Sequence, residues 1–474
     1  MASGLAVGLL SGCSFAPDHE RPPLPVPADW ATPADRNQAA VQRIEWQQFF
    51  KNRSLLSSIQ TALDNNRDLR MAISRVQLAR SEYRAQRADL FPQLQAQAFP
   101  TRLREPGSIT PLGQDITSNL FAGFLNASWE VDLWGRVRNL DEAALDIWLA
   151  TDEARRAVRL TLIAEVANTW LVSRELDERL ALAYQTIETR RDSVRITRRR
   201  YETGYSPRID LTQAESSLGQ AESDASVLER EREQTRNALS VLLGTSAKQD
   251  ITPLSAVETS LVPELPPGLP SDLLENRPDI RGAEDRLRAT EADVGVARAA
   301  FFPRIALFGD YGSASTALGD LFTNNSGAWI YGAAATEPLF QGGRLTGNLA
   351  AAQAQRKIAI ADYERTVQSA FRDVADALAA RRWLAKQIEA QRRTVAALAD
   401  RAHLADLRYR AGSAPYLEVL DAQRDLFSAQ QELVATRRAR LSSEVNLYAA
   451  LGGGDDTPAP SSADSVGSAG SWFP

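Results

Sequence analysis

The chain carries an internal duplication, and this feature restricts its possible folds more than any other. Motifs of the first half recur 208 to 211 residues later: Asp68-Leu-Arg70 as Asp279-Ile-Arg281, Leu90-Phe-Pro92 as Phe301-Phe-Pro303, and Tyr201-Glu-Thr-Gly-Tyr-Ser-Pro207 as Tyr409-Arg-Ala-Gly-Ser-Ala-Pro415. Because the offset stays nearly constant, we infer two homologous halves, over about 50–245 and 260–452, joined by a proline-rich link. Each half must then supply the same set of elements.

Long proline-free stretches in each half predict unusually long helices. Residues 136–203 contain no proline and would extend about 100 Å as a single helix. After the next turn, apolar residues repeat at spacings of three and four: Leu211, Ala214, Leu218, Ala221, Ala225 and Leu228. This heptad spacing is typical of helices that pack along a narrow seam, and alanine permits close approach. The alternative, an amphipathic hairpin on a globular core, needs a wider apolar face.

Between the helices of each half, the pattern changes to alternation. Residues 93–98 and 125–133 alternate polar with apolar side chains, and 304–313 and 328–340 do so more weakly. A period of two predicts strands with one apolar and one polar face. Strands of roughly ten residues are long enough to cross a bilayer when tilted. Two soluble hairpins are the alternative, and exposed loops are predicted at 106–118 and 314–327.

If these four strands cross a membrane, one chain is not enough. Backbone polar groups in lipid need hydrogen-bonding partners, so a spanning sheet must close on itself. The smallest membrane barrels use about eight strands. Several copies must therefore pool their strands, and three copies would supply about twelve strands and about twelve helical columns. A barrel would then continue into a helical tube.

The N-terminus predicts a lipid anchor. A short apolar run at 5–10 is too short to span a bilayer and resembles part of a secretory signal. Leu10-Ser-Gly-Cys13 resembles the bacterial lipobox, in which the cysteine is diacylated and becomes the first mature residue. Ser14 favours sorting to the outer membrane. The alternative is a chance cysteine in an apolar leader.

Composition argues against several function classes. The net charge of −6 does not favour nucleic acid as a partner, and one cysteine cannot form an internal disulfide. The sequence contains no phosphate-binding loop, no HExxH and no GxGxxG after a strand. Neither His19 nor His403 has a cysteine or a second histidine nearby in the sequence. We therefore predict no enzyme activity, no metal and no cofactor, and transport driven by a partner.

The whole pattern resembles a TolC/OprM-type outer-membrane factor, the exit duct of tripartite efflux pumps and type I secretion systems. The resemblance runs from Cys13 to about Gly452 and rests on the lipobox, Ala16-Pro-Asp-His-Glu-Arg-Pro22, Trp46-x-x-Phe49-Phe50, both Phe-Pro helix stops, Leu133-Trp-Gly-Arg136 and the duplicated Tyr-x-x-Gly-x-x-Pro turn. It implies a mainly α fold with a β-barrel portion. Four strands per chain would form a homotrimeric outer-membrane barrel that continues into a long periplasmic α-helical barrel, with a mixed α/β equatorial domain.

These patterns together predict the organisation along the chain. We expect a signal remnant (1–12) and then an anchor and equatorial segment (13–65). The first repeat (66–245) would contain a helix, a β-hairpin at 92–134 and a helical hairpin at 136–243, and a proline-rich equatorial linker (246–275) would follow it. The second repeat (276–452) would contain a helix, a β-hairpin at 303–341 and a helical hairpin at 344–450, and a disordered tail (453–474) would end the chain.

The duplicated turns are predicted to be the periplasmic tips. Gly204 and Gly412 suit the left-handed position that ends a helix, and Pro207 and Pro415 suit the first turn of the next one. Ser206 is predicted to be the N-cap before Pro207. The resemblance adds that an adaptor protein docks at these tips. The docking residues would be Gly204, Ser206, Pro207, Gly412, Ser413 and Pro415.

The second tip also carries a predicted gate. Glu418 and Asp421 lie one helical turn apart, and by resemblance they match the family's paired acidic ring, with Glu in place of the usual Asp. A ring of three copies would make the constriction negative. Acids that only complement the helix dipole are the alternative. The family's gate also uses Tyr and Arg contacts between neighbouring tips.

The residues that make the family's gate contacts are matched in this chain at all but one position. Tyr409 matches the family's tyrosine, and Asp210 occupies the place of its partner acid, so both are predicted to favour the closed state. The expected arginine position holds Ala414, so Arg208 or Arg410 would have to substitute. Expected partners are two further copies of the chain, a periplasmic adaptor, a proton-driven inner-membrane pump and outer-membrane lipid.

Three functions remain open from the sequence. The first is the outer-membrane channel of a drug efflux pump, and the second is the duct of a type I protein-secretion system or of a metal or solvent exporter. The third is a soluble coiled-coil scaffold without a pore. The cargo itself leaves no signature in a water-filled lumen.

Overall fold

The computed structural model describes residues 14–27, 44–111, 113–246, 254–257 and 272–454. They form two compact units. Unit 1 comprises the described residues of 1–23, 75–152 and 282–364, and unit 2 comprises those of 24–74, 153–281 and 365–474. Each unit thus contains residues from both sequence halves.

The predicted alternation of short and very long helices is present. The α-helices are α1 (Trp46–Phe49), α2 (Arg53–Asn65), α3 (Arg67–Ala88), α4 (Arg136–Glu202), α5 (Arg208–Leu243), α6 (Leu254–Val257), α7 (Asp272–Asn276), α8 (Pro278–Ala299), α9 (Arg344–Arg410) and α10 (Tyr416–Ala450). The proline-free stretch is one helix, because α4 has 67 residues, and α9 in the second half also has 67. None of the described helices combines the length and the apolar character needed to span a membrane.

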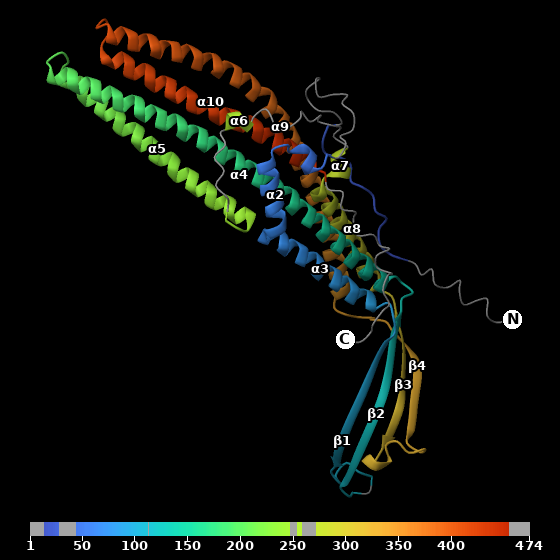
Figure 1. Cartoon of the computed structure of the whole chain (residues 1–474). Coiled ribbons are helices and arrows are strands. Elements are labelled where there is room, and N and C mark those ends of the chain that lie inside the picture. The colour runs from blue at the N-terminus through green and yellow to red at the C-terminus, as the bar shows by residue number, and fades with distance from the viewer. Residues whose placement is uncertain (1–13, 28–43, 112, 247–253, 258–271, 455–474) are drawn as a thin grey trace. The chain divides into compact units, whose positions relative to one another are not determined.

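Unit 1 contains one antiparallel sheet in which the two halves of the chain meet. The strands are β1 (Gln93–Glu105), β2 (Ile116–Val131), β3 (Arg304–Ser315) and β4 (Gly327–Thr336). They lie side by side in the order β1-β2-β3-β4 (Figure 1). The central ladder pairs β2 with β3, from Phe121 opposite Ser315 to Val131 opposite Ile305. The two predicted hairpins therefore form a single sheet.

The strands differ in extent from those predicted. β1 has 13 residues and β2 has 16, so the first hairpin is longer than the alternating core of its sequence. β3 continues to Ser315, inside a predicted loop, because Phe121 of β2 pairs with it there. β4 ends at Thr336, not at 340, and Pro338 follows, whose nitrogen cannot donate to a ladder. A short 3-10 helix, η2 (Leu318–Asp320), lies in the second hairpin's loop.

The sheet has one largely apolar face and one mixed face. Directly opposed residues share a face, so the register assigns every position. The largely apolar face carries Leu94, Ala96, Leu125, Ala127, Trp129, Leu307, Tyr311, Trp329 and Tyr331, with Arg102, Arg104 and Asn119 toward the loop end of the first hairpin. The mixed face carries Gln93, Gln95, Gln97, Asn126, Ser128 and Asp310, together with Phe99, Phe124 and Phe308. This two-sided pattern is the one expected of strands between lipid and water.

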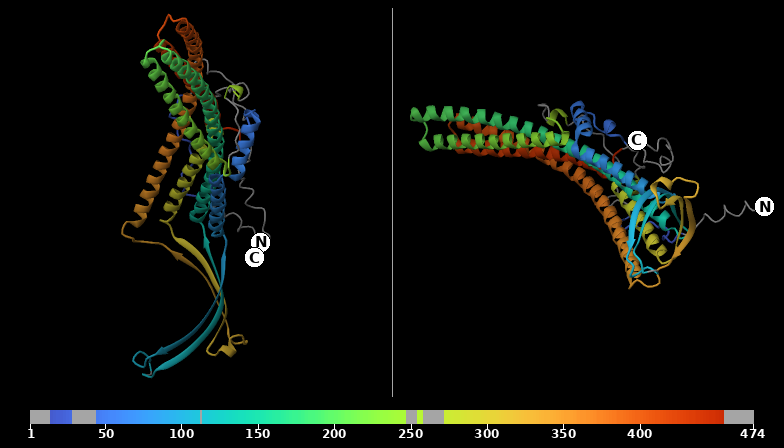
Figure 2. Two further views of the ribbon diagram at one scale, coloured as in Figure 1. Left: turned by 60° about the vertical axis from the view of Figure 1, so that its left-hand side comes forward. Right: turned by 90° about the horizontal axis from the view of Figure 1, so that it is seen from below.

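The long helical hairpins of unit 2 pack along alanine-rich seams, as the heptads predict. Figure 2 shows α5 beside α4 and α10 beside α9. Ala214 is 1% exposed and Ala221 is 2% exposed, and Ala422 of α10 is fully buried. One buried cluster joins Leu176, Leu180, Ala183 and Ile187 of α4 to Ala221, Ala225 and Leu228 of α5. Small side chains at these positions let the helix axes approach closely.

Unit 1 contains a buried aspartic acid, Asp146, whose surroundings destabilise its ionised form. Asp146 of α4 is 7% exposed. Burial, reinforced by repulsion from Asp285, raises the pKa of Asp146 to about 7, although Arg288 opposes the shift. The folded chain therefore holds the neutral acid more easily than the carboxylate. Because the pKa is higher in the folded state, stability falls as pH rises through roughly 4 to 7.

We predict that Asp146→Asn stabilises the protein at pH 8 and has little effect at pH 4. A shift of this size corresponds to an upper limit of about 4 kcal/mol, because each pKa unit is worth about 1.4 kcal/mol. Thermal melting of the two proteins in detergent at both pH values measures the difference. Asp192→Asn, at a side chain that is 69% exposed, is the matched control and should change neither midpoint. An equal effect at the two pH values would contradict the assignment.

Candidate functional site

The two duplicated turns have the same backbone structure. At the first, the amides of Gly204 and Tyr205 donate to the carbonyls of Tyr201 and Arg200, at 3.0 and 2.8 Å. The second turn repeats this with Gly412 and Ser413 donating to Tyr409 and Arg408, at 3.0 and 2.9 Å. These are Schellman motifs, and they require a left-handed residue, which is why glycine stands at both positions, with φ of 74° and 71°. The predicted role of both glycines is confirmed by this geometry.

The helices after the turns begin one residue later than predicted. Pro207 and Pro415 are themselves the N-cap residues, with extended backbones, and neither side chain can cap the helix. The prediction of Ser206 as N-cap is therefore wrong. Its hydroxyl instead donates to the carboxylate of Asp210 at 2.6 Å. The proline fixes the extended backbone that an N-cap needs, and Ser206 is displaced to the position before it.

The repeat offset relates the acids of the two tips. Asp210 and Glu418 are 208 residues apart, and each is the third residue of its helix. Ala414 occupies the place of Ser206, so the second tip lacks the hydroxyl that Asp210 receives. Glu418 is instead paired with Arg408, at 2.5 Å. The sequence analysis did not predict Arg408 as the partner of Glu418. Arg408 is the equivalent of Arg200 in the repeat, 208 residues later, and this offset could have indicated a place at the tip.

Both acids of the predicted ring have arginine partners within the chain. Glu418 is 34% exposed and pairs with Arg408, and Asp421 is 39% exposed and pairs with Arg424 at 3.2 Å. Arg424 also lies 3.4 Å from Asp425. The structure thus brings the two acids to one end of α10, partly exposed and with their charges partly compensated. Whether they form a ring is a property of an assembly, and it stays a prediction.

Tyr409 lies inside the four-helix tip of the chain. It is 9% exposed and packs against Tyr416 with a centroid distance of 5.1 Å, and the guanidinium of Arg200 lies 4.5 Å from its ring centre. The buried cluster around it contains Val194, Ala214, Ala402, Ala405, Tyr416, Val419 and Ala422. Its hydroxyl is buried without a hydrogen-bonding partner among the described residues. Burial raises the pKa of the Tyr416 phenol above its ordinary value.

The remaining predicted gate residues are exposed. Arg410 pairs with Asp406 one turn earlier in α9, at 2.8 Å, and Arg208 begins α5 with an exposed side chain. Neither reaches Asp210 or Glu418 within the described chain. Above the first tip, Arg195 and Arg198 pair with Asp192 and Glu215, at 3.0 and 2.7 Å.

Cys13 lies outside the described residues, but the segment directly after it is held firmly on unit 1. Phe15 stacks on Phe302 with a centroid distance of 4.7 Å, and its carbonyl accepts from Arg298. The backbone of this segment also lies so close to α8 that α8 needs a glycine there. A Cβ on Gly295 would lie 2.8 Å from the nitrogen of Ala16, so only glycine allows this approach.

A charged clamp completes the attachment of this segment. His19 bridges two buried glutamates of α8, at 2.8 Å to Glu291 and 3.3 Å to Glu284. Arg21 pairs with Glu284 at 3.0 Å, and Arg356 of α9 pairs with Glu291 at 2.9 Å. Burial would raise the pKa of Glu284, but hydrogen bonding and charge from Arg21 outweigh it and lower that pKa. His19 thus holds a structural contact that the sequence did not indicate.

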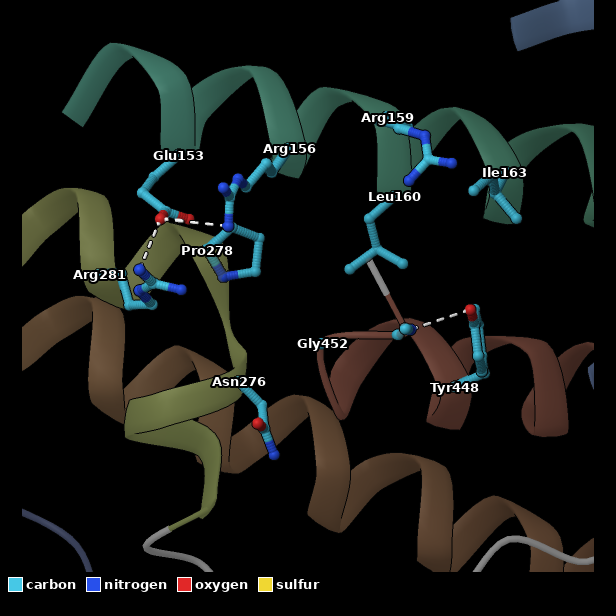
Figure 3. A pocket seen from close by; sticks show the side chains of 12 residues that line it. Glu153, Arg156, Arg159, Leu160, Ile163, Asn276, Pro278, Arg281, Tyr448 and Gly452 are labelled. Carbon is cyan, nitrogen blue, oxygen red and sulfur yellow. Dashed lines mark hydrogen bonds and ion pairs between the residues drawn. The ribbon is translucent and has the colours of Figure 1, made fainter. Parts of the chain in front are cut away.

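Unit 2 also contains a small pocket of about 30 Å³ (Figure 3). Glu153 points toward Arg281 and Arg156 and pairs with them at 3.0 and 3.6 Å. On the other side, the amide of Gly454 donates to the hydroxyl of Tyr448 at 3.1 Å. A space of this size holds a water molecule or two. The residues that line it include no Ser, Thr, Cys, Lys or His. Across the described residues, no three His, Cys, Asp or Glu side chains are grouped so that they could hold a metal ion.

Comparison with known proteins agrees with this architecture. The family model described as "Outer membrane efflux protein" matches residues 58–245 and 269–453, one match in each half. The antibiotic efflux pump outer membrane protein ArpC of Pseudomonas putida and the toluene efflux pump outer membrane protein TtgC of a second P. putida strain are each 42% identical over 455 residues, which covers 94% of this chain and 93% of theirs.

A solved structure shows the same fold. The open state of the Neisseria gonorrhoeae MtrE outer membrane channel superposes with a TM-score of 0.82 at 34% identity, over 93% of this chain and 98% of that one. Both the sequence and the structure thus match along nearly the whole length. The chain belongs to the outer membrane efflux protein family.

Proposed function

We propose that this protein is the outer-membrane channel of a tripartite efflux pump. Three copies form one passive duct that carries drugs or other small toxic compounds from an inner-membrane pump and a periplasmic adaptor to the cell exterior. The observation that carries the proposal is the four-stranded sheet with one apolar face, in which β1 and β4 each have a single neighbour. Such a sheet needs further strands in lipid, and three copies give a closed wall of about twelve strands.

The names of the relatives support small molecules as cargo. ArpC is named for antibiotics and TtgC for toluene, and neither name refers to protein secretion. We therefore place the chain with exporters of drugs and solvents. The energy would come from a partner pump, since the sequence of this chain has no nucleotide-binding motif. By resemblance to the family, we propose a proton-driven pump as that partner.

The proposal is tested with the purified full chain. In detergent we expect a particle with three times the mass of one chain, and in planar lipid bilayers we expect discrete conducting channels. Deletion of the gene should raise sensitivity to drugs or solvents, and the intact gene should restore resistance. A monomer without affinity for detergent micelles, or a trimer that never conducts, would refute the function.

We propose further that the gate lies at the duplicated turns. Glu418 and Asp421 would form the negative constriction, Asp210 and Tyr409 would favour the closed state, and Arg208 or Arg410 would reach a neighbouring copy. The partly exposed side chains of Glu418 and Asp421 and the closeness of Arg408 support this arrangement. The adaptor would dock on the Schellman turns around Gly204 and Gly412, which expose Tyr205 and Ser413.

We predict opposite effects from the two members of one ion pair at this gate. Glu418→Gln combined with Asp421→Asn should lower the preference for K⁺ over Cl⁻ by about twofold or more, because the negative charge of the constriction is removed. Arg408→Ala should raise that preference, because it frees the charge of Glu418 from its partner. The reversal potential of single channels in a KCl gradient measures both.

Asp192→Asn is the matched control for these variants. It removes an equally charged, exposed acid that pairs with an arginine on α4, and it should leave the reversal potential unchanged. If Arg408→Ala and the double acid variant shifted the reversal potential in the same direction, the assignment of the ring would be wrong.

We propose that Cys13 carries the lipid anchor. The firm attachment of residues 14–23 to unit 1 supports this, because it would hold the anchored end at a fixed place on the chain. Intact-protein mass spectrometry should find a mature chain that begins at Cys13 and carries acyl groups. The Cys13→Ser variant should lack the mass of the acyl groups.

A second variant separates lipidation from docking of the segment. His19→Ala with Arg21→Ala removes the contacts to Glu284 and Glu291 but keeps the cysteine. We expect unchanged acylation and faster hydrogen exchange over 14–23. An acyl-free wild-type protein from outer membranes would exclude the anchor.

A further inference from the structure

The centre of the mixed face combines three phenyl rings with one carboxylate, that of Asp310. Asp310 of β3 stands opposite Asn126 of β2. On the same face, Phe308 lies two residues away along β3, and Phe124 lies two residues from Asn126 along β2. Two residues along a strand span about 7 Å, and neighbouring strands are about 5 Å apart. One small molecule could therefore touch the carboxylate and both rings at once.

Glycines opposite the rings allow them to lie flat on the sheet. Gly312 is the partner of Phe124, and a Cβ there would lie 2.8 Å from Cδ1 of that ring. Gly332 is the partner of Phe308, and a Cβ there would lie 2.9 Å from its Cζ. Phe99 of β1 stacks on Phe124 with a centroid distance of 6.1 Å. The rings are therefore held by their cross-strand partners and still present a face, since Phe99 is 40% and Phe308 is 37% exposed.

The charge of this patch is negative and lacks a cationic partner among the described residues. The amide of Asn126 donates to the carboxylate of Asp310, which orients the side chain without neutralising it. The other charges of the same face are accounted for. Glu130 and Arg304 pair with each other at 3.0 Å near one end of the strands, and Glu105 stands at the other end. The centre of the face thus has one negative charge between aromatic rings.

We propose that this patch, formed by Phe99, Phe124, Phe308, Asn126 and Asp310, is a binding site for hydrophobic cations inside the barrel. The inference rests on the proposed function, because a trimeric barrel turns the mixed face toward the lumen. The rings would contact the apolar body and attract the cation through their faces, and Asp310 would pair with the charge. Charge complementarity selects cations over anions of the same shape. Three copies would place three such patches around the exit path.

The test uses the purified full chain in planar bilayers with two probes of equal shape and opposite charge. Tetraphenylphosphonium should reduce the single-channel current at a concentration at least about tenfold lower than tetraphenylborate does. Tetraethylammonium, which lacks rings, should block weakly. Asp310→Asn should remove most of the difference between the two tetraphenyl ions. Phe308→Leu, which keeps the charge and an apolar side chain, should weaken the cation block severalfold.

Matched controls separate this patch from other sites. Tyr311→Leu alters an aromatic side chain on the opposite face, and Asp320→Asn removes an acid from the hairpin loop, so both should leave the block unchanged. Block that persists in Asp310→Asn but disappears when Glu418 and Asp421 are neutralised would move the site to the tip and overturn the proposal. Equal block by both tetraphenyl ions would overturn it as well.

The outcomes also distinguish this inference from the proposed function. A protein that never conducts refutes the duct itself, whereas a conducting trimer without charge selectivity in the block refutes only the binding patch. If Asp310→Asn fails to assemble, two other measurements still test the patch. They are the block of Phe308→Leu and equilibrium dialysis of the wild-type trimer against each tetraphenyl ion. Equal retention of the two ions would then contradict the proposal.

Discussion

The edges of the four-stranded sheet impose the constraint on which the rest of the structure depends. Within the described residues, β1 pairs only with β2, and β4 pairs only with β3. A row of backbone donors and acceptors is therefore left on each outer strand. In hydrocarbon, every such unpaired group costs several kcal/mol, which no side chain in a strand can repair. The edge β4 of one copy must meet the edge β1 of the next, and the assembly follows from this requirement.

The duplication makes this solution possible with a short chain. Each half supplies two strands and one long helical hairpin, and the ladder between β2 and β3 joins the halves into one sheet. The same repetition appears at the helix ends, where two Schellman turns are built from equivalent residues. Alanines at the seams let the paired helices approach closely over many turns without a broad apolar core. A chain of this kind extends its contacts along helices, and it needs copies of itself to enclose a space.

Sequence reasoning succeeded where periodicity or backbone conformation decides the structure. The heptads predicted the seams, the missing prolines predicted the 67-residue helix α4, and the repeated glycines predicted the left-handed turns. It failed where a few tertiary contacts decide. Ser206 looked like an N-cap, but the proline after it takes that position and leaves the hydroxyl to Asp210. The end of β3 depended on its pairing with β2, and the clamp around His19 joins residues about 270 positions apart, for which no local pattern exists.

The two tips differ electrostatically because equivalent positions hold different residues, Ser206 at the first tip and Ala414 at the second. At the first tip, a serine hydroxyl satisfies the acid, so no cation is required and the local charge stays at Asp210. At the second tip, Ala414 offers no donor, and Glu418 takes the guanidinium of Arg408 instead. The charge of Glu418 is therefore partly compensated within its own chain, whereas Asp210 has no cationic partner among the described residues. A single difference between the two repeats, Ser206 in the first and Ala414 in the second, thus accompanies two different ways of holding the equivalent acid.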